Sequence, residues 1–168
     1  LRILSNLADR AVVTARVRFS TDDLGSSGLD GGAVRDAIVT ANNIALADPY
    51  RAATHNKGVM NGIDALAIAT GNDWRAIEAG AHSFAAASGQ YRPLTLWTVT
   101  ADGDLLGEIS LPLKIGTVGG TLEANPSAAL GIAICGAGSA IELAELMAAV
   151  GLAQNFAALR ALVGRGIQ

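Results

Sequence analysis

Cysteine and histidine are scarce in this chain, and their scarcity limits the kinds of site it can hold. Cys135 is the only cysteine among 168 residues, so no internal disulfide can form and a reducing compartment is the default. It lies in an apolar stretch, where a buried packing role is favoured over a nucleophilic one. His55 and His82 are the only histidines, and neither stands at zinc-ligand spacing with Cys135 or with the other. No metal site is expected.

Charge is also low. Charged residues make up 16% of the chain and apolar residues 51%, with a net charge of −3. A nucleic-acid partner would need a concentrated basic face, and no run of Lys or Arg occurs. The longest uncharged stretch, 124–141, contains a proline and glycines, which makes it a poor membrane span. We expect a cytoplasmic protein, not bound to membrane or nucleic acid, that buries apolar surface in a homo-dimer or larger homo-oligomer.

Hydrophobic patterning and turn residues predict helices and antiparallel strands in separate runs. A β-branched, alternating segment predicts a strand at 11–19, and Asp30 is a suitable cap for a helix through 47. The Asp-Gly turn at 102–103 predicts a hairpin of strands 93–100 and 105–111. Further helices are expected at 63–69, 73–87, 127–135, 139–150 and 154–163, with a turn at 21–28, an irregular polar segment at 50–58 and a glycine-rich loop at 114–121. This order predicts an α+β fold in which helices pack with antiparallel strands.

Three side chains in the polar middle of the chain could carry chemistry. Lys57 stands in the segment expected to be irregular, and its compact charge suits stabilisation of an oxyanion; an ordinary exposed lysine is the alternative. Asp73 is expected to fold back toward Lys57 and favour its charged form, or else only to cap a helix. Arg51 could hold a substrate carboxylate with its planar fork, or form a surface salt bridge. The loop at 116–121 has neither dinucleotide-binding nor P-loop spacing.

Taken together, the segments resemble one family, the class II (bacterial) 3-hydroxy-3-methylglutaryl-CoA (HMG-CoA) reductases. Residues 48–64, DPYRAATHNKGVMNGID, are similar to the segment that holds the catalytic lysine of that family. Residues 69–82, ATGNDWRAIEAGAH, are similar to the segment that holds its catalytic aspartate. The loop IGTVGG at 115–120 and the helical segments 149–155 and 158–162 also match. The resemblance covers essentially the whole chain.

This resemblance implies an oxidoreductase of isoprenoid metabolism that interconverts HMG-CoA with mevalonate and CoA. The cofactor would be NAD or NADP, with two hydride transfers at a thioester and then an aldehyde carbon. The family's active site forms between two subunits. By the match, the catalytic residues are Lys57 and Asp73, the substrate-binding residues are Arg51, Asn61, Gln154 and Asn155, and Asn6 lies near the nicotinamide.

Several parts of the family pattern are missing from these residues. The catalytic glutamate and the nucleotide-binding domain lie upstream in the family, and the catalytic histidine lies on a C-terminal flap just beyond Gln168. The opening residues also lack an initiator Met and the plan of a signal peptide. We therefore expect 1–168 to be part of the large substrate-binding domain, inactive alone. Asn125 stands where the bacterial form usually has a histidine. The alternative is a non-catalytic interaction or CoA-ligand-binding module derived from the same fold.

Overall fold

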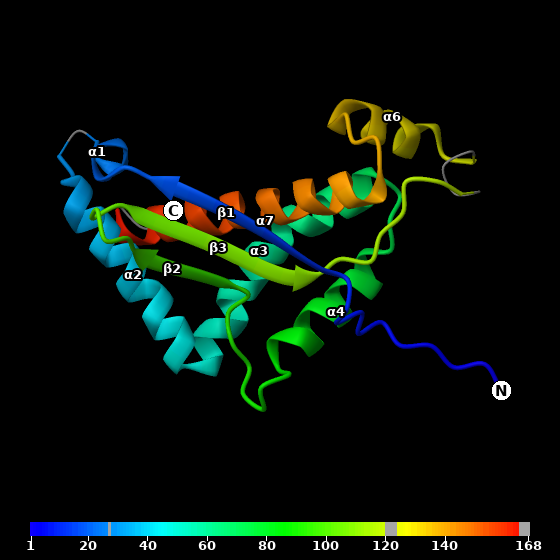
Figure 1. Ribbon diagram of the computed structural model, residues 1–168, viewed down its shortest axis with the longest axis horizontal. Helices are drawn as coiled ribbons and strands as arrows, with labels where there is room; N and C mark the ends of the chain where they lie inside the picture. The colour runs from blue at the N-terminus through cyan, green and yellow to red at the C-terminus, as the bar shows by residue number, and fades with distance from the viewer. Residues whose placement is uncertain (27, 120–123, 165–168) are drawn as a thin grey trace.

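A three-stranded antiparallel sheet forms one side of the protein (Figure 1). The computed structural model describes residues 1–26, 28–119 and 124–164. The strands lie in the order β1-β3-β2, with bounds Val12–Phe19, Leu105–Pro112 and Thr95–Val99. Phe19 pairs with Leu105 and Val12 with Pro112 along the two long strands. The expected hairpin is confirmed, because β2 and β3 pair across the Asp102-Gly103 turn.

The two faces of the sheet differ in chemistry because side chains alternate along each strand. Arg16 and Arg18 of β1 form ion pairs with acidic residues of β3 and its turn on the exposed face. The other face is apolar, and Trp97 lies flat across Gly107, where an added Cβ would come within 2.3 Å of the indole ring. The fully buried side chains of this face and of the helix beneath it include Trp97, Leu105, Ile109, Leu111, Leu143, Met147 and Leu159.

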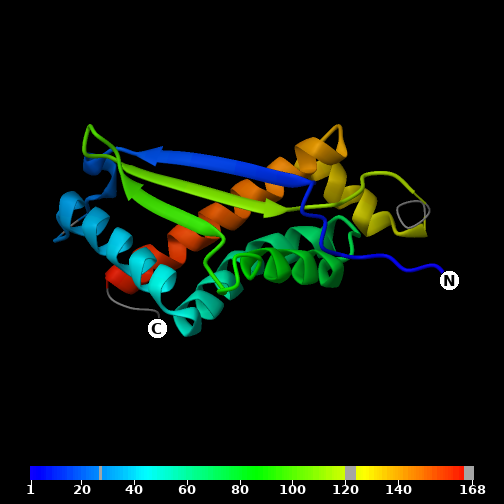
Figure 2. The same cartoon turned by 60° about the horizontal axis from the view of Figure 1, so that its bottom comes forward.

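Helices cover the apolar face in layers. Figure 2 shows α7 crossing directly beneath the strands; α3 packs against α7, and α4 contacts both α3 and β3. The helices of the described residues are α1 (Thr21–Leu24), α2 (Gly31–Ala47), α3 (Pro49–Ala69), α4 (Trp74–Ala85), α6 (Pro126–Cys135) and α7 (Ala140–Val163). Helix α7 has 24 residues and a hydropathy of 1.5 over its most apolar window, which is enough for a membrane span by length and composition. Here it is the central helix of the core, in contact with β1, β3 and α3. The α+β expectation is confirmed.

Two expectations about the helices are wrong, for reasons of tertiary packing. Residues 50–58 are not irregular but form the first turns of α3, which Asp48 caps by accepting a hydrogen bond from the Tyr50 N–H at 3.0 Å. The expected break near Gly151 is absent, and α7 is continuous. An added Cβ at Gly151 would lie 2.8 Å from Ile63 of α3, so this glycine allows close packing rather than ending a helix. The expected turn at 21–28 also contains the short helix α1.

The elements predicted from capping residues are confirmed. Asp30 caps α2 by accepting from the Ala33 N–H at 2.8 Å, and Asp73 caps α4 by accepting from the Ala76 N–H at 3.1 Å. Asn125 caps α6. The loop expected at 114–121 has no helix or strand over 114–119, and its last residues lie outside the described part of the chain.

Candidate active site

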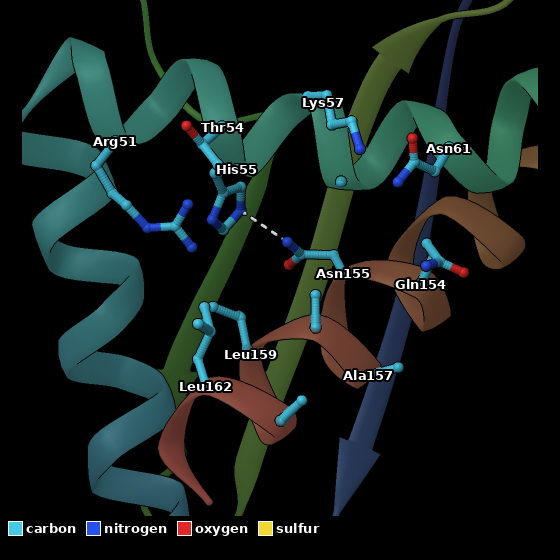
Figure 3. A pocket seen from close by; sticks show the side chains of 13 residues that line it. Arg51, Thr54, His55, Lys57, Asn61, Gln154, Asn155, Ala157, Leu159 and Leu162 are labelled. Atoms are coloured by element: carbon cyan, nitrogen blue, oxygen red, sulfur yellow. Dashed lines mark hydrogen bonds between the residues drawn. The ribbon is translucent and has the colours of Figure 1, made fainter. Parts of the chain in front are cut away.

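A cavity of about 700 Å³ lies between the first half of α3 and the second half of α7. Figure 3 shows its polar side chains: one helix presents Arg51, Lys57 and Asn61, and the other presents Gln154. The remaining lining is largely alanine and leucine from α7. The fold therefore brings five of the expected site residues to one place, although the α3 and α7 members lie about a hundred positions apart in the sequence: Arg51, Lys57, Asn61, Gln154 and Asn155.

The charge of this cavity is one-sided. Among the described residues, no carboxylate lies within ion-pair distance of Arg51 or Lys57, whereas Arg16, Arg18 and Arg35 are all paired. The surface salt bridge considered for Arg51 is therefore not seen in the described part of the chain. Two cations and three amide side chains in a cavity whose remaining lining is largely apolar suit a small ligand that carries a carboxylate and a second polar centre.

A buried polar network forms the floor of the cavity. His55, Thr95 and Asn155 are each 2% exposed, and they join α3, β2 and α7. Nε2 of His55 lies 2.5 Å from Thr95 Oγ1 and 3.1 Å from Asn155 Nδ2. Asn155 Oδ1 accepts from the Thr95 hydroxyl at 2.9 Å and from the Trp97 indole N–H at 2.8 Å. Burial, and then the nearby charge of Arg51, lowers the pKa of His55 to about 4, so the ring is neutral at physiological pH.

The segment that contains Lys57 has both buried and exposed polar side chains. His55 and Asn56 point into the core, where the Asn56 side chain donates to the Arg92 carbonyl at 2.9 Å and accepts from the Leu94 N–H at 2.8 Å. Lys57 is exposed at the cavity rim. Asn155 was expected to bind substrate, but its amide oxygen is already held by two donors from the fold.

Asp73 lies at the other end of α3, so the expectation that it folds back toward Lys57 is wrong within one chain. From residue 57 to residue 69, α3 rises about 18 Å at about 1.5 Å per residue. Asp73 follows the turn after α3 and begins α4. A lysine and an aspartate side chain together do not span that separation, and Asp73 does not line the Lys57 cavity.

A second hollow, of about 380 Å³, lies beside the first turns of α4. Its polar lining comes from Ser5, Asn6 and Lys114, so Asn6 and the start of the glycine-rich loop share this place. Gly80 allows the N-terminal segment to cross α4 closely, since an added Cβ there would lie 2.8 Å from the Asn6 carbonyl oxygen. Asn6 therefore lines a different hollow from the one that Lys57 lines.

Sequence reasoning missed two features of α3 and α4. Asp64 of α3 faces Glu78 of α4, and burial first, then the hydrogen bond and charge of Glu78, raises the pKa of Asp64 to about 7. Glu78 also lies 2.6 Å from His82, and His82 in turn lies 2.6 Å from the Tyr91 hydroxyl. The second feature is Asn72, whose side chain contacts the glycine-rich loop. The Asp64–Glu78 and Asn72–Gly116 pairs have no characteristic sequence spacing, because each joins residues of different elements that come together only in the fold.

The fold and these two hollows define an α+β protein with a cationic cavity between two long helices. Comparison with known proteins is more specific. The chain belongs to the hydroxymethylglutaryl-coenzyme A reductase family, whose model matches residues 1–168.

Similar proteins agree with this assignment. The chain is 53% identical over 168 residues to 3-hydroxy-3-methylglutaryl-coenzyme A reductase of Archaeoglobus fulgidus, covering 100% of this chain and 37% of that protein. It is 42% identical to a probable reductase of Borreliella burgdorferi, covering 39% of that protein. A reductase structure from Streptococcus pneumoniae matches with a TM-score of 0.93 and 52% identity, over 99% of this chain and 40% of that one. A class II structure from the same organism, bound to NADPH, matches with a TM-score of 0.92 and 51% identity, over 96% of this chain and 44% of that one. The chain therefore spans about two fifths of the length of the curated relatives it matches.

Proposed function

We propose that residues 1–168 are part of the large substrate-binding domain of a cytoplasmic HMG-CoA reductase. The observation that carries the proposal is the cavity between α3 and α7, where Arg51 and Lys57 face an apolar space without a carboxylate partner among the described residues. Such a cavity suits an acidic acyl substrate, and it lies on the segment that resembles the catalytic lysine segment of the family. The catalytic glutamate, the flap histidine and the nucleotide-binding domain would belong to the rest of the protein, so this part alone would not turn over.

Each cavity side chain has a role in the proposed reaction. Lys57 would place its ammonium beside the thioester carbonyl and stabilise the negative charge that develops on that oxygen. Arg51 would hold the far carboxylate of the hydroxymethylglutaryl group with its planar fork. Asn61 and Gln154 would donate and accept hydrogen bonds along the chain between them. Asn155 would contribute through the cavity floor rather than by contact with the substrate.

The second hollow fits the nicotinamide end of a cofactor. Asn6, Ser5 and Lys114 supply an amide, a hydroxyl and a cation around a space of about 380 Å³, and the neighbouring glycines leave the backbone open to close approach. A bound NAD or NADP would supply the hydride that the reduction of a thioester requires. Asn6 and Lys114 would orient the nicotinamide.

We further propose that Lys57 and Asp73 meet between two subunits. Within one chain the length of α3 separates them, whereas the proposed reaction needs a carboxylate beside the lysine. A symmetric dimer can place the Asp73 end of one subunit over the Lys57 cavity of the other, and it does so twice. Exposed apolar side chains on and near α6, such as Leu130 and Ile134, are consistent with such an assembly.

The roles of Lys57 and Arg51 predict opposite kinetic effects in the full-length protein. Lys57→Ala should lower turnover by about a hundred- to a thousandfold, because one preorganised charge at an oxyanion is lost. The dissociation constant of HMG-CoA should change only about two- to threefold, because that interaction forms mainly in the transition state. Arg51→Ala should mainly raise the dissociation constant, because a remote carboxylate is held alike in ground and transition states. Lys57→Ala protein that no longer bound HMG-CoA, but kept single-turnover reduction, would refute the role of Lys57.

A further inference from the structure

We propose that Asn72 is a positioning residue that holds the glycine-rich segment 114–119 against the Asp73 turn. This inference rests on the proposed function, since it assigns the segment to the hollow that would receive the cofactor. Asn72 is not among the site residues expected from the sequence.

Two hydrogen bonds, here called the clamp, join the Asn72 side chain to the backbone of Gly116. Asn72 Nδ2 donates to the Gly116 carbonyl at 3.1 Å, and the Gly116 N–H donates to Asn72 Oδ1 at 2.9 Å. Residues 72 and 116 are 44 positions apart, so the pair joins two elements that are distant in sequence. Among the hydrogen bonds found for the described residues, these two are the ones that tie segment 114–119 to the rest of the chain.

Asn72 is itself held by the end of α3. Its backbone N–H donates to the Ala67 carbonyl at 2.8 Å, and its side-chain nitrogen lies 3.0 Å from the Thr70 hydroxyl oxygen. The Thr70 hydroxyl donates to the Leu66 carbonyl at 2.8 Å, and Thr70 is 1% exposed. Gly71 turns the chain here with φ of +68°, a left-handed value that glycine adopts without strain. The clamp therefore starts from a rigid base.

The position of the clamp connects the two halves of the second hollow. Asp73, the next residue, caps α4, whose first turns line the hollow. Lys114, two residues before Gly116, also lines the hollow. Gly116 and Gly119 carry no side chain, so without the clamp this exposed segment would gain many backbone conformations. Asn72 thus ties the segment that carries Lys114 to the turn that carries Asp73, and small displacements of such groups are costly in catalysis.

The test compares three variants of the full-length protein: Asn72→Ala, Asn72→Gln and Asn72→Ser, with Asn43→Ala as a control at an exposed position of α2. Asn72→Ala should lower turnover by about ten- to a hundredfold while the KM for HMG-CoA, set at the Lys57 cavity, changes less than about threefold. The KM for the nicotinamide cofactor should rise. Asn72→Gln keeps both amide functions on a longer chain and should recover part of the loss, whereas Asn72→Ser should not.

Amide hydrogen exchange supplies a readout independent of activity. Without cofactor, the peptide covering 113–119 should exchange faster in Asn72→Ala than in wild type or Asn43→Ala. Wild-type protein that does not reduce HMG-CoA would refute the proposed function itself. If wild type is active, then Asn72→Ala with unchanged exchange and turnover within about twofold of wild type would overturn only the role of Asn72. A fall in turnover that matches a loss of folded protein by circular dichroism, without rescue by Asn72→Gln, would overturn it too.

Discussion

Adjacent side chains on α7 differ completely in what they contact. Gln154 is exposed and lines the cavity, whereas Asn155 is buried and holds Thr95 and Trp97. Asn155→Ala should lower the free energy of unfolding by about 2–4 kcal/mol, because it leaves buried donors unpaired. Gln154→Ala should change it by less than about 0.5 kcal/mol and instead weaken HMG-CoA binding. Urea denaturation and binding measurements on both variants of the full-length protein check this pair. An Asn155→Ala protein with wild-type stability but weaker HMG-CoA binding would show instead that Asn155 contacts the substrate.

For single residues, the sequence could identify which residues belong to the site but not where their side chains point. Lys57, Asn61 and Gln154 were predicted from their segments, and they do face one cavity. The same reasoning could not separate Gln154 from Asn155, because the difference is set by the packing of α7 against β2. Asn72 was missed for a related reason: its partner, Gly116, belongs to another element.

The packing of α4 on α3 should depend on pH. The pKa of Asp64 is raised to about 7, chiefly by burial and then by Glu78, against 3.8 for the ordinary side chain. Between these values the folded state binds a proton that the unfolded state lacks, so stability falls as pH rises through this window. Asp64→Asn keeps a donor toward Glu78 and removes the titration. We expect Asp64→Asn to reduce the loss of stability with rising pH. It should also raise the melting temperature of the full-length protein at about pH 8.

Melting temperatures at acidic and at alkaline pH check this prediction, with Asp9→Asn as a control at an exposed position. Glu78, His82 and Tyr91 are unchanged in both variants, so the comparison isolates the effect of the side chain at position 64. Parallel pH curves for wild type and Asp64→Asn would show that the pair does not take up a proton on folding.

Local signals predicted the helices and strands well where they were strong, and failed where distant contacts decide. Asp30 and Asp73 caps and the Asp-Gly turn correctly placed α2, α4 and the hairpin. The polar residues of 50–58 predicted a loop, yet they form the start of α3. There the Asn56 side chain is hydrogen-bonded in the core, and His55 Nε2 contacts Thr95. Gly151 was expected to interrupt the helix, yet its missing side chain allows α7 to pack closely against Ile63. Tertiary packing overrode propensity in both cases.

For the whole molecule, the separation of Lys57 and Asp73 is the feature from which the assembly is inferred. The length of α3 holds the two polar hollows apart in one chain. The domain expectation, that 1–168 is part of a larger substrate-binding domain, stays a prediction. So does cytoplasmic location. The central claim is that one active site takes Lys57 from one subunit and Asp73 from the other.

Mixed dimers test that claim most directly. Full-length Lys57→Ala and Asp73→Asn proteins, each inactive as a homodimer, are co-expressed with different tags and the heterodimer is purified. If the residues meet between subunits, one of the two sites in the heterodimer is intact and the other carries both changes, so turnover should recover to about half of the wild-type value. If both residues acted within one chain, every site would carry one change. A purified heterodimer as inactive as its parents would contradict the account.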